Sequence, residues 1–250
     1  MEYLANKYGR NIISLGVNCF PSKFIRTSGF NDNNVTKLFD YVGTSMYGII
    51  KLINEGFDDL ININNYELIY YPHRKMYLAT NTKLTFIYVH GFSMQSEKTM
   101  NQKNVELMKT QIINYNENKQ IKRIEHMKNI LNSEKIMFIR IEGASHYRNP
   151  DDPSLSDYDY SIILSNTLKK KYPSLDFLIV LICKLPTSYN SEHNILTLKI
   201  YEHVVAYDNC EKALSDLFKE NEGFIKNMHN TVKTIFCDSD NIHVPTNKSQ

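Results

Sequence analysis

Two apolar runs, "KIMFIRI" at residues 135–141 and "DFLIVLI" at 176–182, carry the clearest sign of how this chain folds. Each has the length of one strand, and neither alternates with polar residues, so both faces of each strand must be buried. A helical pattern at 160–171 lies between them, and another strand, "NILTLKIYE", follows at 194–202. Buried strands separated by helices are typical of parallel sheets. The sequence therefore predicts an α/β fold with a layered, largely parallel central sheet flanked by helices.

The segment "NIISLGVNCFPSKFIRTSGF" at 11–30 fits the same scheme. Residues 11–16 predict a buried strand that stops at Gly16, and Pro21 suits the first turn of a helix that runs to about Thr27. Thr44 is the expected N-cap of the next helix. Because the loops after parallel strands carry the functional groups of such sheets, we expect chemistry within 16–20 and 142–158.

Residues 61–93 differ from the rest of the chain, since short aromatic and β-branched runs alternate there with turn residues. This pattern predicts a β-rich aromatic insertion. A long helix is expected at 101–131, with a break at "NYNENKQ" and with His126 exposed, and a last helix at 210–218. Since no linker or repeat divides the chain, we expect a single α/β domain over 1–240 and a frayed tail over 241–250.

Composition and motif content exclude several classes of function. The 29 basic and 27 acidic side chains leave a net charge of +2, so no overall field attracts nucleic acid. The sequence has neither a secretory signal pattern nor an apolar run that could span a membrane. Its four cysteines form no CxxC pair, and glycine-rich phosphate motifs and HExxH are absent. We therefore expect a cytoplasmic protein with no metal, cofactor, nucleic-acid or membrane partner, which acts on a small molecule, a peptide or a glycan.

Cys19 is the strongest candidate for a nucleophile. It lies between the glycine that ends the predicted strand and the proline that begins the predicted helix. The N–H groups and the positive dipole at a helix start lower the pKa of a thiol placed there. Gly16 would permit a tight turn, and the N–H groups near Asn18 and Phe20 could form an oxyanion hole for acyl transfer. A packed, inert cysteine at the strand end is the alternative.

A thiol nucleophile needs a base, and the pattern leaves three histidines open. His90 ends the apolar run "LTFIYVHGF", and His146 lies in the loop after 135–141. His243 follows Asp240 at the D-x-x-H spacing of SGNH-type hydrolases. Asp40, between two aromatic residues, fits either a turn-forming residue or the carboxylate that orients a histidine.

A binding module without chemistry is a second class of function, and it uses other residues. Arg140, His146 and Arg148 gather around one strand-end loop and could bind the anionic part of a nucleotide or a glycan. A structural or host-interaction protein with a degenerate site is a third hypothesis. The tyrosine-rich composition is compatible with it and does not distinguish it from the others.

The segments around Cys19 and Asp40 resemble a known family. "ISLGVNCFPSKFIRTSGF" and "LFDYVGTSMYGIIKLINEGFDDL" are similar to the DUF1796 family of papain-like cysteine peptidases. The family pattern is met by the stretch at 13–16, by Cys19, by the Ile-Arg and glycine within 25–29, and by Phe-Asp-Tyr at 39–41. The later "VHGF", "RIEHMKNIL" and "KIMFIRI" fit the same pattern.

The resemblance implies a cysteine-dependent hydrolase of the acyl-transfer class that cleaves an amide or isopeptide bond. Cys19 would attack the carbonyl, His90 would be the base and Asp40 would orient His90. Ester hydrolysis or acyl transfer to a glycan is the alternative within this class. Leu38 stands where the family has proline, and Tyr41 where it commonly has tryptophan. The family name implies a papain-like fold with a helical half and a barrel, whereas the strand order favours a layered α/β sheet.

Overall fold

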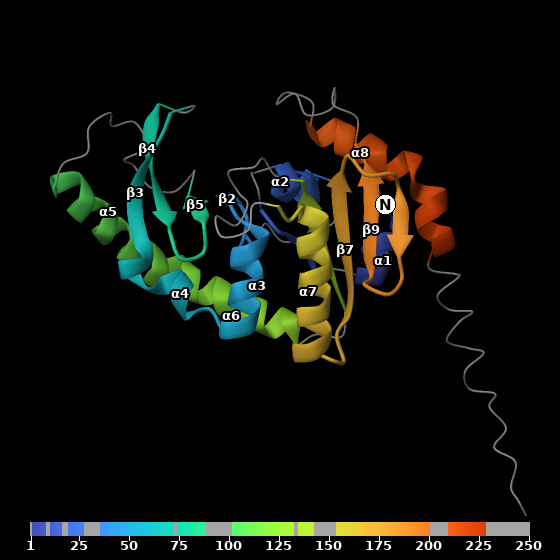
Figure 1. The fold of residues 1–250 in the computed structure, drawn as a ribbon, viewed down its shortest axis with the longest axis horizontal. Helices are drawn as coiled ribbons and strands as arrows, with labels where there is room; N and C mark the ends of the chain where they lie inside the picture. The colour runs from blue at the N-terminus through green and yellow to red at the C-terminus, as the bar shows by residue number, and fades with distance from the viewer. Residues whose placement is uncertain are drawn as a thin grey trace, which may run out of the picture.

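A computed structural model describes residues 2–8, 11–16, 20–27, 36–72, 75–88, 102–132, 135–142, 154–200 and 210–228. Its strands form a five-stranded sheet, to which the long apolar runs belong, and a four-stranded antiparallel sheet (Figure 1). Helices cover both faces of the five-stranded sheet. The predicted α/β class, with a largely parallel central sheet and a β-rich aromatic insertion, is therefore confirmed.

The central sheet has the strand order β1-β6-β7-β9-β8. Its strands are β1 (Ile12–Ser14), β6 (Lys135–Ile141), β7 (Asp176–Cys183), β8 (Ser188–Asn190) and β9 (Ile195–Lys199). All neighbours pair in parallel except β8, which is antiparallel to β9. The carboxyl ends of β1 and β6 therefore lie side by side at one edge of the sheet, where functional groups are expected.

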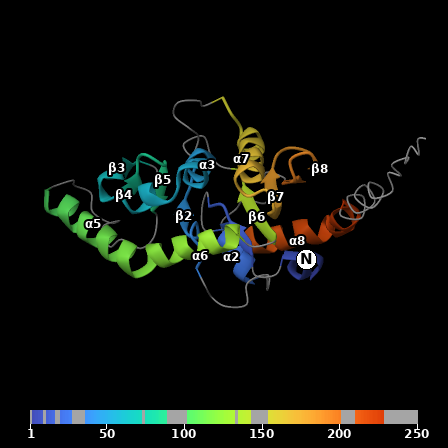
Figure 2. The ribbon, with the colours of Figure 1, turned by 90° about the horizontal axis from the view of Figure 1, so that it is seen from below.

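Side chains of the central sheet alternate between two apolar clusters, one on each face. The helices of the first face are α3 (Met46–Glu55) and α7 (Asp157–Lys171), and those of the second are α1 (Glu2–Tyr8), α2 (Phe20–Thr27) and α8 (Cys210–Glu220). Phe138 packs in the first cluster and its neighbour Ile139 in the second. Figure 2 shows α7 on one side of the strands and α2 and α8 on the other. This arrangement explains why the predicted strands are apolar throughout.

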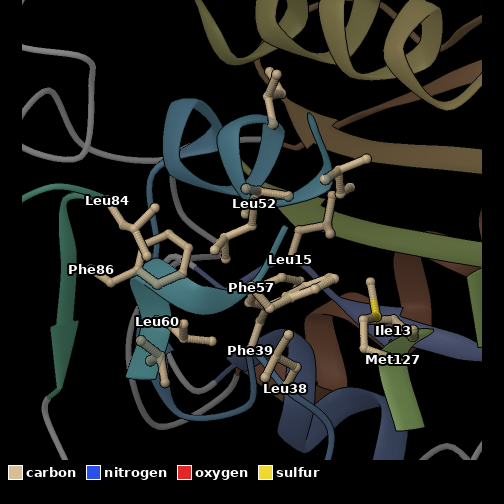
Figure 3. Packing of buried hydrophobic residues seen from close by; sticks show 14 of the residues in the cluster. Ile13, Leu15, Leu38, Phe39, Leu52, Phe57, Leu60, Leu84, Phe86 and Met127 are labelled. Atoms are coloured by element: carbon tan, nitrogen blue, oxygen red, sulfur yellow. The ribbon is translucent and has the colours of Figure 1, made fainter. Parts of the chain in front are cut away.

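The second sheet contains the aromatic insertion and has the strand order β2-β5-β4-β3. Its strands are β2 (Val42–Gly43), β3 (Tyr66–Tyr71), β4 (Met76–Asn81) and β5 (Phe86–Tyr88), and two short helical segments, α4 (Asp58–Ile61) and η1 (Ile63–Asn65), precede β3. The first apolar cluster extends into this sheet. Figure 3 shows Leu15, at the end of β1, near Leu52 of α3 and Phe57, with Phe86 of β5 beyond them. The two sheets thus share one apolar core.

The long helical pattern forms α5 (Gln102–Tyr115), η3 (Asn116–Gln120) and α6 (Ile121–Leu131). The break predicted at "NYNENKQ" is wrong, because residues 116–120 form a π-helical turn and the helix continues through it (Figure 2). A π turn changes which side chains face inward. Here it buries the polar side chain of Asn116, whose amide donates to the carbonyl of Ile61 at 3.0 Å.

Two helix starts differ from the prediction because of their caps. Ser45 rather than Thr44 caps α3, since its hydroxyl accepts the N–H of Gly48 at 2.9 Å. Helix α7 begins at Asp157, earlier than the predicted 160, because Ser156 forms a capping box at its N-terminus. The predicted tail over 241–250 lies outside the described residues.

Candidate active site

The structure describes four of the predicted site residues: Gly16, Phe20, Asp40 and Arg140. The other seven lie outside the described residues, namely Asn18, Cys19, His90, His146, Arg148, Asp240 and His243. The four described residues show which strands, helices and turns surround the predicted site. The roles of the other seven stay predictions.

Gly16 lies two residues beyond the end of β1, and its backbone conformation favours glycine. Its φ is 74°, a conformation that glycine adopts readily and other residues rarely. A Cβ atom at this position would overlap the side chain of Thr44 and lie 2.8 Å from the carbonyl oxygen of Val42. Its N–H donates to the hydroxyl of Ser14 at 3.1 Å, so this donor is already engaged. Glycine therefore lets the end of β1 pack directly against β2.

Helix α2 begins at Phe20, four residues after Gly16. The Phe20 side chain is buried in the apolar cluster shared with α8, and the neighbouring Phe24 stacks on Phe218 of α8 with ring centroids 5.1 Å apart. Ser22, in the first turn of α2, is buried; its hydroxyl makes no hydrogen bond within the described residues but lies near enough to the carboxyl group of Asp40 to oppose the rise of its pKa. The packing against α8 thus fixes the start of α2 next to Asp40.

Asp40 closes the turn that precedes β2. Its N–H donates to the carbonyl of Lys37 at 3.3 Å, and its Oδ2 accepts the N–H of Lys37 at 2.8 Å. Burial raises the pKa of this carboxyl group, against the opposing effects of the Lys37 N–H, the Ser22 hydroxyl and the charges of Arg26 and Arg123. Of the two roles that its sequence position allowed, the turn-forming one is directly visible.

Basic and aromatic side chains surround this turn. Arg26 donates to the hydroxyl of Tyr41 at 2.6 Å, and Tyr41 has a φ of 62°, which is unusual for a large side chain. Lys37 lies 3.0 Å from Nε2 of His126 on α6. His126 is half-buried rather than exposed as predicted, because the turn covers its side of α6. Burial and the charge of Lys37 lower the pKa of His126, which favours the neutral ring as acceptor.

A row of tyrosines connects β5 to the turn at Asp40. Tyr66 donates to the hydroxyl of Tyr88 at 3.1 Å, and the ring of Tyr88 meets that of Tyr115 edge-on. Burial raises the pKa of Tyr66 to about 12 and also raises the pKa of Tyr88. Arg123 of α6 donates to the hydroxyl of Tyr115. The last described residue of β5, Tyr88, pairs with Val42, two residues after Asp40.

Arg140 lies inside the protein, at the carboxyl end of β6. Its side chain is fully buried and donates to the carbonyl of Leu15 at 2.8 Å and to the carbonyl of Thr44 at 2.9 Å. It also forms an ion pair with Asp157 at 3.1 Å. These contacts favour a structural role, in which Arg140 joins β1, α3 and α7, over the predicted role in binding an external anion. The other two residues of that predicted anion site, His146 and Arg148, lie outside the described residues.

Within the described ranges, no three His, Cys, Asp or Glu side chains lie close enough together to hold a metal ion. Also within those ranges, no helix has the length and apolar character that a membrane span requires.

Comparison with known proteins gives one finding. The model of a family described as "Putative papain-like cysteine peptidase (DUF1796)" matches residues 10–185, which cover the region around Gly16, the turn at Asp40, both sheets up to β7 and the helices between them. Neither the curated proteins nor the solved structures gave a match.

Proposed function

The chain belongs to the DUF1796 family. From the description of that family and from the place of Asp40, we propose that the chain is a cysteine-dependent hydrolase of the acyl-transfer class. In this proposal Cys19 attacks an amide or ester carbonyl, His90 is the general base and acid, and Asp40 orients His90. The observation that carries the proposal is the place of Asp40, between the first turn of α2 and the end of β5.

Chain connectivity supports the meeting of the three residues. Cys19 directly precedes Phe20, the first residue of α2, and Ser22 in the first turn of α2 lies near the Asp40 carboxyl group. His90 follows Tyr88 by two residues, a separation of no more than about 7 Å. In the antiparallel register Tyr88 is opposite Val42, which follows Asp40 by two residues, so both Asp40 and position 90 are two residues from the same pair.

The chemistry follows from these roles. The Cys19 thiolate forms a bond to the carbonyl carbon, and backbone N–H groups near Phe20 stabilise the oxyanion. The bond from carbon to the leaving nitrogen or oxygen then breaks as protonated His90 gives its proton to the leaving group. Water, deprotonated by His90, attacks the thioester and releases a carboxylic acid and the free thiol. Asp40 holds the imidazole in the required tautomer and stabilises its protonated form.

The pH dependence of Cys19 alkylation by iodoacetamide, followed by mass spectrometry, tests this proposal. We expect Cys19 to react well below the ordinary thiol pKa of about 8.5, and His90→Ala to shift the titration. Cys183 is the internal control, because it is buried and burial raises its pKa to about 11. The proposal fails if Cys19 titrates like an ordinary thiol, or if a Cys19→Ala protein retains turnover of a substrate.

A further inference from the structure

The four-stranded sheet ends in a long strand that is paired on one side only within the described residues. Strand β3 stands last in the order β2-β5-β4-β3, and Figure 1 shows it as the outermost strand of that sheet. Three other described strands stand at the edges of the two sheets: β2 has two residues, and β1 and β8 have three each. Because β3 has six residues, it presents the longest of these edges.

The register between β3 and β4 decides which backbone groups of β3 point away from the sheet. Thr82 donates its N–H to the carbonyl of Asn65 at 2.8 Å, directly before the first residue pair of the two strands. In an antiparallel ladder, hydrogen-bonded pairs alternate with pairs that are not hydrogen-bonded. Every second residue of β3 after Asn65 therefore bonds to β4. The backbone groups of the residues between them point outward, namely those of Tyr66, Leu68 and Tyr70.

Two of these three residues have both outward groups available. The N–H of Tyr66 donates to the carbonyl of Ile63. Within the described ranges, the outward N–H and C=O groups of Leu68 and Tyr70 have no hydrogen-bond partner. The Leu68 side chain is buried in the first apolar cluster, and Tyr70 is 45% exposed. An added antiparallel strand would satisfy these backbone groups.

Strand β3 also lacks the features that commonly protect the edge of a sheet. Protected edge strands are short, or carry lysine, proline or a bulge. Residues 66–71 contain no lysine, arginine or proline, and Glu67 is their only charged side chain. The register with β4 is continuous over all six residues, so β3 has no bulge. A long edge without such protection favours pairing with another extended chain.

We propose that β3 pairs with the β3 strand of a second copy of this chain, antiparallel about a two-fold axis at Ile69. In this register Leu68 lies opposite Tyr70 of the second copy, and each residue of the pair donates its N–H and accepts at its C=O. The axis repeats the pair, so all the outward groups of Leu68 and Tyr70 on both copies are used. The proposal is independent of the function proposed for Cys19.

The side chains of β3 favour a second copy as the partner. In the proposed register Ile69 meets its own counterpart, Leu68 meets Tyr70, and Glu67 lies opposite Tyr71. Apolar and aromatic pairs across two strands stabilise a sheet, whereas like charges directly opposite one another destabilise it. The two Glu67 side chains are four residues apart along the paired strands, about 13 Å. The interface is self-complementary and closes as a dimer. Because a single strand edge buries little surface, we expect a weak dimer.

Sedimentation velocity of the full chain, in the presence of a reductant, tests this proposal. We expect the sedimentation coefficient to rise towards that of a dimer between about 10 and about 500 μM, as for a small interface. Tyr70→Pro removes an outward N–H that the ladder with β4 does not use, so the variant should fold and its dimer dissociation constant should rise about tenfold or more. Tyr70→Thr is the matched control, because it loses the same ring and keeps the N–H. Circular dichroism checks that both variants are folded.

Ile69→Cys tests the register itself. The two introduced thiols would face each other in a pair that is not hydrogen-bonded, with Cα atoms about 4.5 Å apart, within the range of a disulfide. We expect oxidised glutathione, which accepts the two electrons, to link this variant into dimers about tenfold or more faster than Glu67→Cys, whose thiols would lie about 13 Å apart. The wild-type chain measures the background from its own cysteines.

Three results would overturn the proposal. One is a chain that stays monomeric over the whole concentration range, which would leave the edge to an extended peptide of another protein. Another is equal dissociation constants for Tyr70→Pro and Tyr70→Thr, because the outward N–H would then not take part. The third is equal cross-linking of Ile69→Cys and Glu67→Cys.

Discussion

At the scale of single residues, Gly16 shows how one position can depend on the absence of a side chain. Its positive φ and its contact with Thr44 and Val42 act together, since an added Cβ would be strained and would have no space. We expect Gly16→Ala to lower the free energy of unfolding by about 2–4 kcal/mol, measured by urea denaturation.

Gly56 provides the control for this prediction. It also has a positive φ, of 102°, but no atom lies within 4 Å of a Cβ placed there. Gly56→Ala should therefore cost only the conformational strain, about 1–3 kcal/mol. Equal losses in the two variants would show that the contact of Gly16 with β2 contributes nothing.

Asp40 has a visible structural role and a proposed catalytic one, and two substitutions separate them. Asp40→Asn keeps an oxygen that can accept the N–H of Lys37, whereas Asp40→Ala removes it. We expect the alanine variant to lose about 1–2 kcal/mol of stability and the asparagine variant to lose little. Both should reduce turnover on the order of 100-fold or more, because neither can orient and stabilise a protonated His90.

The raised pKa of Asp40 determines whether its ionisation increases or decreases the stability of the protein. Because burial raises this pKa above its value in the unfolded chain, ionisation costs stability as pH rises from about 4 through the folded-state pKa. Asp40→Asn should remove this loss, which offsets a weaker hydrogen bond from the N–H of Lys37, so its unfolding free energy at neutral pH should stay close to that of the wild type. A stable but fully active Asp40→Asn protein would exclude the catalytic role.

At the scale of elements, the contact between α6 and the turn before β2 depends on the neutral form of His126. Its pKa is lowered in the folded state, so as pH falls below about 6.5 the unfolded chain takes up the proton first and stability decreases. His126→Gln, whose side-chain oxygen can still accept from Lys37, should be less sensitive to acid in this window.

Urea denaturation of both proteins at about pH 7.5 and about pH 5.5 measures this difference. Burial raises the pKa of Asp40 in both proteins, so any contribution of its titration is common to them and cancels in the comparison. Parallel losses of stability in the wild type and in His126→Gln would contradict the prediction.

Elements could be predicted from the sequence where their signals are local. The strands at 135–141 and 176–182 were found within one residue, because unbroken apolar runs identify buried parallel strands. The π turn at 116–120 was not found, since a run of polar residues looks the same in a break and in a continuous helix. The cap of α3 was misplaced by one residue because Thr44 and Ser45 are both good caps, and only the contact of Thr44 with Leu15 decides between them.

Less of the candidate site could be predicted from the sequence, because its contacts join segments that are far apart along the chain. Gly16 and Asp40 were identified from local patterns. Lys37 and His126 are 89 residues apart, and no periodicity indicates that they meet. The same holds for Arg140, which was predicted to bind an anion because it lies with His146 and Arg148 around one strand-end loop; its partner Thr44 is 96 residues away.

At the scale of the whole molecule, Arg140 joins parts of the chain that pack as separate layers. It extends from β6 to the end of β1, to the start of α3 and to Asp157 at the start of α7. Arg140→Met keeps much of the volume but leaves the largely buried Asp157 without this cation and removes a donor from the carbonyl groups of Leu15 and Thr44, of which Leu15 retains the Thr44 hydroxyl. Removing one partner of a buried ion pair typically costs about 3–5 kcal/mol, and we expect a loss of that size.

Lys135→Met tests whether this loss comes from the buried contacts or from the charge itself. Lys135 is exposed at the other end of the same strand, so its substitution removes an equal charge and should change stability by no more than about 0.5 kcal/mol. Urea denaturation followed by circular dichroism measures both variants. Because Arg140 bonds to groups on both sides of the junction between the two sheets, its loss should also reduce the reactivity of Cys19, which follows Leu15 by four residues. A destabilised Arg140→Met protein with wild-type Cys19 reactivity would show that the junction supports the fold without positioning the thiol.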